Sequence, residues 1–162
     1  MLIDVFAKIF KNHMIIVPII AWAVSQVIKI AVCFVTEKRL VLKKIVSDGG
    51  MPSAHTATVV SLAVMCGWTQ GFDSAVFAAA MILAIVIMRD AVGVRFESGV
   101  NAAAIKKLAE EANENTDDPA EKIRTDNLKL GVGHTPLQVA CGLLVAIIVS
   151  TLYIVIGDIP TP

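Results

Sequence analysis

The longest apolar run in the chain, residues 14–35, limits its fold more than any other feature. As an α-helix its 22 residues extend about 33 Å, enough to span the roughly 30 Å hydrocarbon core of a bilayer. The run is longer than the core of a signal peptide, and no small-x-small cleavage motif follows it. We therefore expect a retained membrane anchor, helical over residues 14–36.

Three further apolar runs, at residues 54–70, 72–91 and 135–156, are interpreted as additional membrane helices. Gln70 and Gly71 separate the first two, which predicts a tight helical hairpin. The expected fold class is all-α, an integral membrane bundle of four transmembrane helices that forms a single domain over residues 1–162. The run at 54–70 is short for a full span, which leaves room for tilt or for a partner subunit.

Two other segments flank these runs. Residues 1–13 mix apolar side chains with Asp4, Lys8 and Lys11, a pattern that predicts a helix at the membrane interface. Residues 100–131 are polar and are predicted to be helical in two pieces, with the second beginning near Asp118.

Composition excludes several functional classes. The hydrophobic share of 56% exceeds that of an ordinary soluble domain, so the lipid bilayer is the expected surrounding. The formal net charge is zero and no basic stripe is present, so no nucleic-acid partner is expected. The three cysteines, at 33, 66 and 141, lack paired spacing, which argues against disulfides and a zinc site. The sequence leaves a homo-oligomer open.

Residues 47–58, SDGGMPSAHTAT, place polar groups directly before an apolar helix. Gly50 permits a turn, Pro52 fixes the approach to the helix, and Ser53 is a suitable N-cap. His55 would then stand beside unbonded backbone N–H groups at a helix N-terminus, where an anion such as phosphate binds favourably. An ordinary glycine-rich turn with a capping histidine is the simpler alternative.

An even number of spans places the connection before helix 54–70 and the connection before helix 135–156 on one membrane face. Two histidines with several cations suit phosphoryl transfer, in which one imidazole attacks phosphorus and the other protonates the leaving oxygen. The carboxylates are too few for a dinuclear metal centre, so neither a metal nor a cofactor is expected. The residues gathered on this face are Lys29, Arg39, His55, Arg89, Asp90, Arg95 and His134.

Three polar residues, at positions 29, 90 and 138, have structural alternatives. Lys29 either extends its ammonium group to the basic end of its helix or contributes to the site. Asp90 is expected to form an ion pair with Arg95 rather than to act directly in catalysis. Gln138 either closes a capping box with Thr135 or orients His134, and both roles are compatible.

Four segments, KIAVCFVTEKR, GGMPSAHT, MRDAVGVRFESG and GHTPLQV, together resemble the divergent branch of the type-2 phosphatidic acid phosphatase superfamily. This branch comprises membrane proteins related to acid phosphatases and vanadium haloperoxidases. The resemblance extends from about Lys29 to Gly142.

The resemblance implies a role for each matched residue. Lys29, Arg39 and Arg95 would bind phosphate with Ser53, His55 would be the general acid, and His134 would form a phosphohistidine. Asp90, Gly50, Pro52 and Thr135 would support the site. The sequence departs from the parent pattern at two positions. Phe96 stands where a second arginine is frequent, and Gln138 replaces the carboxylate that orients the nucleophile.

The leading functional hypothesis is a multi-pass cell-membrane phosphatase that is independent of metal and hydrolyses a lipid-linked phosphate or an isoprenyl pyrophosphate. A catalytically silent relative that binds or transports an anionic lipid, and a helical scaffold, are the alternatives. Basic residues concentrate in the two connections on the site face, which predicts a cytoplasmic site.

Overall fold

The computed structural model describes residues 7–37, 50–114, 122–126, 128 and 132–162, with the backbone alone at Glu37. These ranges contain α-helices and no strand, which confirms the all-helical class. The helices, in chain order, are α2 (His13–Glu37), α4 (Ala54–Gln70), α5 (Ala75–Val92), α6 (Val94–Glu114) and α7 (Pro136–Ile156).

Side-chain caps fix where three of these helices begin. The Thr56 amide donates to Ser53 Oγ at 3.4 Å before α4, and the Phe77 amide donates to Ser74 Oγ at 3.1 Å before α5. Thr135 caps α7. Each cap accepts a hydrogen bond from an amide that has no partner within the helix. Ser53 is therefore the N-cap that the sequence predicts.

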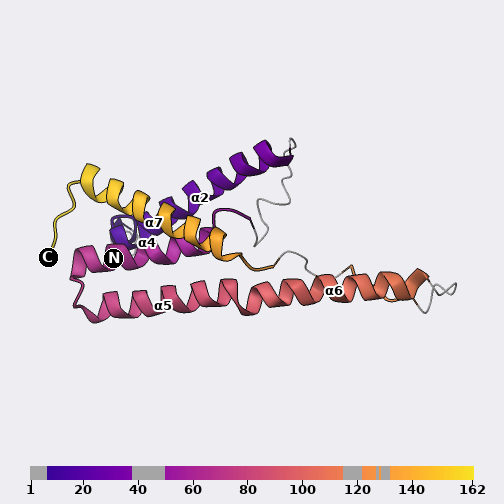
Figure 1. Ribbon diagram of the computed structural model, residues 1–162. Coiled ribbons are helices and arrows are strands. Elements are labelled where there is room, and N and C mark those ends of the chain that lie inside the picture. Colours follow the sequence, from indigo (N-terminus) through magenta and orange to yellow (C-terminus); the bar gives the residue numbers. More distant parts are fainter. Residues whose placement is uncertain (1–6, 38–49, 115–121, 127, 129–131) are drawn as a thin grey trace.

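Helix α4 is the centre of the bundle, and α2, α5 and α7 each pack against it (Figure 1). Ten of its 17 residues are buried. The surrounding helices instead present large apolar side chains outward, such as Trp22, Ile82 and Leu144, which are 49%, 61% and 57% exposed. Such apolar outer faces suit contact with lipid rather than water.

Buried rows at four-residue spacing run along the inner faces of α2, α4 and α7. Most of the side chains are small, which allows membrane helices to approach closely. No residue in the three rows is more than 8% exposed: Val17, Ala21 and Ser25; Ala57, Ser61 and Met65; Ala146, Ser150 and Ile154.

Three helical stretches of the described chain are long and apolar enough to cross a membrane: His13–Thr36, the α5–α6 stretch Ala75–Glu114, and Pro136–Ile156. The four-span prediction is therefore not confirmed. The predicted and observed numbers of spans differ because of α4. Its 17 residues extend about 26 Å, which is less than the roughly 30 Å thickness of the hydrocarbon core. Because the other helices enclose α4, it does not need a lipid-facing apolar surface.

The connection between α5 and α7 differs from its predicted form. Helix α6 begins at Val94, immediately after a break at Gly93, and continues the direction of α5 away from the bundle (Figure 1). Residues 122–126 contain a turn and no helix, whereas the predicted second helix start at Asp118 lies outside the described residues. The side-chain amide of Asn113 donates to the Ile123 carbonyl at 3.0 Å and accepts the Ile123 N–H at 2.8 Å. These two hydrogen bonds take the place of helical ones at Ile123.

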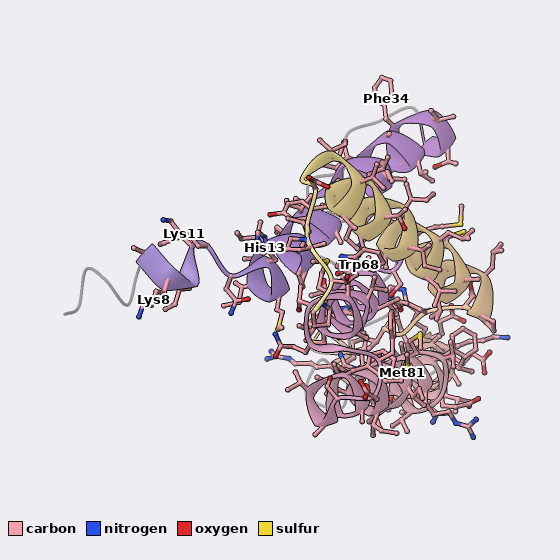
Figure 2. The ribbon with its side chains drawn as sticks, turned by 90° about the vertical axis from the view of Figure 1, so that its left-hand side faces the viewer. Lys8, Lys11, His13, Phe34, Trp68 and Met81 are labelled. Carbon is pink, nitrogen blue, oxygen red and sulfur yellow. The ribbon has the colours of Figure 1, made fainter. Side chains whose placement is uncertain are left out.

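The segment before α2 lies to one side of the bundle. Figure 2 shows Lys8 and Lys11 on a short turn that projects away from the other helices, whereas Trp68 lies among them. Phe10 in this segment is 75% exposed. Its placement at a membrane interface stays a prediction, and residues 1–6 lie outside the described ranges.

Candidate functional site

The local sequence before α4 presents His55 at the start of a buried helix. Ser53 and Pro52 are buried, and His55, the second residue of α4, is exposed. The Thr56 hydroxyl donates to Ser53 Oγ at 3.0 Å, so the serine hydroxyl is engaged within the cap. The cap thus fixes the first turn of α4 while the imidazole of His55 points out of it.

His134 comes directly before the cap of α7 and is only 3% exposed. Its backbone N–H donates to the Ala91 carbonyl at 2.9 Å, which attaches this residue to the last turn of α5. One turn into α7, the Gln138 carbonyl accepts the Ser53 N–H at 3.0 Å. Two long-range backbone hydrogen bonds therefore hold the starts of α4 and α7 and the end of α5 together.

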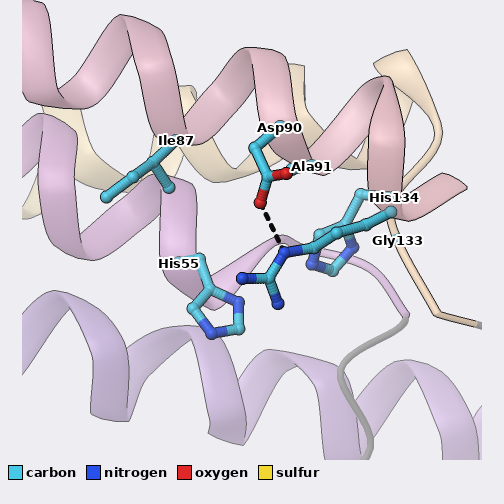
Figure 3. A pocket seen from close by; sticks show the side chains of 7 residues that line it. His55, Ile87, Asp90, Ala91, Gly133 and His134 are labelled. Atoms are coloured by element: carbon cyan, nitrogen blue, oxygen red, sulfur yellow. Dashed lines mark hydrogen bonds and ion pairs between the residues drawn. The ribbon is translucent and has the colours of Figure 1, made fainter.

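The two imidazoles face each other across a small pocket. Their ring centroids are 6.2 Å apart with an interplanar angle of 58°. The pocket has a volume of about 120 Å³, which is room for several water molecules and therefore for a phosphoryl group. Figure 3 shows this histidine pocket, which is lined by His55, Ile87, Asp90, Ala91, Arg95, Gly133 and His134.

The side chain of Gln138 determines the proton position on His134. Gln138 Oε1 accepts the Thr135 backbone N–H at 3.1 Å, and this obligatory donor identifies the atom as the amide oxygen. The same oxygen lies 3.2 Å from His134 Nδ1. Because a carbonyl oxygen only accepts hydrogen bonds, Nδ1 must carry the proton. In the neutral ring, the lone pair is then on Nε2.

The capping box of α7 coexists with this orienting contact. The Gln138 amide donates to Thr135 Oγ1 at 3.4 Å, and the Gln138 side chain returns to the Thr135 amide. The capping box is therefore confirmed. One amide oxygen serves both the helix cap and the imidazole, so the two interpretations of Gln138 hold together.

Arg95 supplies the positive charge in the histidine pocket. Its Nε lies 2.5 Å from Asp90 Oδ2, so the predicted ion pair is confirmed (Figure 3). The two side chains are 51% and 38% exposed, which places the pair in a solvated position. The N-termini of α4 and α7 add the favourable ends of two helix dipoles. The site is therefore suited to an anion.

Two glycines allow the segments around the pocket to approach one another. A Cβ on Gly142 of α7 would lie 2.5 Å from the Ser53 carbonyl oxygen and 3.0 Å from Thr56 Cβ. A Cβ on Gly133 would collide with the backbone of Arg95 and Phe96, and Gly133 also has a φ of +90°. Gly142 thus allows α7 to approach α4 closely. Gly133 allows the segment before α7 to approach the start of α6.

Lys29, predicted to bind phosphate, is not among the residues that line the histidine pocket. Lys29 is 7% exposed, and its stem passes Gly50, where an added Cβ would lie 3.4 to 3.6 Å from Lys29 Cε, Cδ and Cγ. Its ammonium group therefore does not extend to solvent at the helix end. Arg39, predicted to bind phosphate, lies outside the described residues.

No three His, Cys, Asp or Glu side chains within the described ranges come close enough to hold a metal ion. The third histidine, His13, is at the far end of α2, where its Nδ1 lies 3.0 Å from the Tyr153 hydroxyl. The two histidines of the pocket therefore do not share it with a third imidazole.

Sequence reasoning missed three contributors to the pocket. The Ala91 carbonyl holds His134, Ile87 forms an apolar wall, and Gly133 admits the backbone of α6. Only Gly133 left a signal in the sequence, as the second glycine of the GVGHTP segment. The Ala91 carbonyl and the apolar side chain of Ile87 have no such signal, because every residue of a membrane helix has a carbonyl and most have apolar side chains.

Comparison with known proteins identifies the family of the chain. The model of the divergent PAP2 family matches residues 10–149. The uncharacterized membrane protein YuiD of Bacillus subtilis (strain 168) is 35% identical over 149 residues, which cover 88% of this chain and 94% of YuiD. No solved structure matches the chain. The chain is a membrane protein with several apolar helices, and it belongs to the divergent PAP2 family.

Proposed function

We propose that this protein is a phosphatase, independent of metal, that hydrolyses a lipid-linked phosphate or pyrophosphate through a phosphohistidine. The observation that carries the proposal is the contact between His134 Nδ1 and Gln138 Oε1 at 3.2 Å, beside a second imidazole, that of His55, whose ring centroid is 6.2 Å away. This arrangement gives one imidazole a defined nucleophilic nitrogen beside a second imidazole that can exchange protons.

Burial and orientation distinguish the roles of the two histidines. His134 is buried and held at both its backbone N–H and its Nδ1, which suits a nucleophile that must attack along a fixed line. His55 is exposed, which suits an acid and base that must exchange protons with water.

The reaction would take two steps. In the first, His134 Nε2 attacks phosphorus, the bond to the leaving oxygen breaks, and protonated His55 transfers its proton to that oxygen. In the second, neutral His55 takes a proton from water, the resulting hydroxide attacks phosphorus, and the bond to Nε2 breaks. Arg95 and the two helix N-termini would stabilise the phosphoryl oxygens throughout.

The membrane arrangement is part of the proposal. Enclosed α4 would serve as a fourth, short span, and residues 1–13 would lie at the opposite interface from the site. The substrate phosphate would then enter the histidine pocket at the membrane boundary while its hydrocarbon chain stays in the bilayer. Eleven of the 14 Lys and Arg residues lie in 37–53 and 89–131, which supports a cytoplasmic site.

The decisive test measures phosphate release by the purified full-length protein from phosphatidic acid and from isoprenyl pyrophosphates. We expect turnover by the wild type, in chelator as well, and a loss of at least about 100-fold in His134→Ala. His13→Ala is the matched control, because His13 contacts Tyr153 far from the pocket. Equal phosphate release by wild type and His134→Ala would refute the catalytic proposal.

A second candidate function, binding of an anionic lipid without turnover, is favoured by the neutral side chain of Gln138. An amide accepts a hydrogen bond but adds no negative charge to stabilise an imidazolium. The binding function predicts thermal stabilisation by inorganic phosphate with no turnover. A phosphohistidine trapped at His134 by rapid quenching would exclude it.

A further inference from the structure

Two consecutive residues at the end of α5 hold two different parts of the histidine pocket. The Ala91 carbonyl accepts the His134 N–H at 2.9 Å, and the Asp90 carboxylate lies 2.5 Å from Arg95 Nε. We infer that Asp90 is a positioning residue, which orients the Arg95 guanidinium toward a phosphate in the pocket; this inference rests on the proposed function of that site.

The break between α5 and α6 is what makes the Asp90–Arg95 contact possible. In an uninterrupted helix, residues five positions apart point about 140° away from each other. Here α5 ends at Val92 and α6 begins at Val94, with the Gly93 N–H donating to the Arg89 carbonyl at 2.9 Å. The change of helix at Gly93 therefore directs the two side chains toward each other.

The ion pair engages a particular edge of the guanidinium. Arginine has one N–H on Nε and four on its two Nη atoms, all in one plane. Because Asp90 contacts Nε, the edge formed by the two Nη atoms is the one that a phosphate would meet, and two parallel hydrogen bonds from one edge suit phosphate oxygens. Asp90 would thus select an end-on mode of phosphate binding.

Solvation limits the size of the effect. With the two side chains 51% and 38% exposed, Asp90 contributes to orientation rather than greatly to stability. The expected consequence of its removal is weaker phosphate binding with little change in the chemical step. Since the His134 anchor is the backbone of Ala91, substitution of the Asp90 side chain leaves that hydrogen bond in place.

The experiment combines Asp90→Ala, Asp90→Asn, Arg95→Ala and the double variant Asp90→Ala/Arg95→Ala in the full-length protein. Glu97→Gln is the matched control, because Glu97 is an exposed carboxylate of α6 outside the wall of the histidine pocket. Three quantities are measured: KM and kcat for lipid phosphate hydrolysis, and the Kd for inorganic phosphate.

We expect Asp90→Ala to raise KM and the phosphate Kd about fivefold, with kcat changed less than about twofold. Asp90→Asn should recover part of the loss, because its amide oxygen can still accept the Arg95 N–H. In the Arg95→Ala background, Asp90→Ala should have no further effect on KM or on the phosphate Kd.

Two results would contradict the inference, and two others concern the proposed function. An equal loss on Asp90→Ala in both backgrounds would show that Asp90 acts through the fold, and unchanged binding in Asp90→Ala would show no role. If the wild type binds phosphate with the expected dependence on both Asp90 and Arg95 but releases none from lipid, the proposed function fails and the positioning role stands. If the wild type neither binds nor releases phosphate, both are overturned.

Discussion

Nδ1 of His134 lies 3.2 Å from Oε1 of Gln138, one turn further along the chain at the start of α7. The same oxygen accepts the Thr135 N–H at 3.1 Å, so its identity and the ring proton opposite it are both defined. In the proposed mechanism, this glutamine would perform the orienting part of what a carboxylate does for a nucleophilic histidine. It does not supply the electrostatic part.

Replacement of Gln138 by glutamate separates these two contributions. Gln138→Glu retains an acceptor for both N–H groups and adds a negative charge beside the imidazole, so we expect phosphate release to rise on the order of tenfold. Gln138→Leu should reduce it by about tenfold to 100-fold, because the proton position on His134 is no longer fixed. Initial rates with a saturating lipid phosphate measure both, and a slower Gln138→Glu enzyme would contradict the prediction.

Removal of His55 should separate the two chemical steps. A substrate with a good leaving group, such as p-nitrophenyl phosphate, needs little protonation, so His55→Ala should still phosphorylate His134 while hydrolysis of the intermediate falls about 100-fold or more. Acid-sensitive phosphohistidine should therefore accumulate, measured by mass spectrometry after a rapid alkaline quench. Accumulation in His134→Ala instead would reverse the assigned roles.

Gly142 should be sensitive to any larger side chain. Gly142→Val places atoms against the Ser53 carbonyl and Thr56, which should separate α7 from α4 and lower the unfolding free energy by about 1 to 3 kcal/mol. The melting temperature in detergent, followed by tryptophan fluorescence, measures this loss. Leu144→Ala, on the exposed face of α7, is the control and should change the melting temperature little.

Gly133 should affect the site more than the rest of the fold. Gly133→Ala combines an unfavourable φ of +90° with a collision against the backbone of Arg95 and Phe96, so α6 must move and carry Arg95 with it. We expect phosphate binding to weaken about tenfold or more, measured by calorimetry with inorganic phosphate. Unchanged binding would show that the contact between Gly133 and α6 does not position Arg95.

Local patterns in the sequence predicted much of the secondary structure. Apolar runs marked the helical stretches, and residue types marked the caps at Ser53 and Thr135. Both rest on interactions within a few residues, which the order of amino acids specifies directly. The second helix predicted within residues 100–131 is not formed over 122–126, where Asn113 bonds to Ile123 across ten positions, and local rules do not include such a contact.

Local sequence patterns predict an all-helical membrane chain with two histidines at helix starts, and the family resemblance implies a catalytic role for each. Tertiary packing sets the 6.2 Å separation of their rings, the anchoring of His134 by Ala91 and the enclosure of α4 by the other helices. The reason is physical: the relative positions of helices depend on close contacts between residues far apart in the chain. The contact between Gly142 and Ser53 is one of them, and the 3.6-residue period of a single helix does not encode its partner.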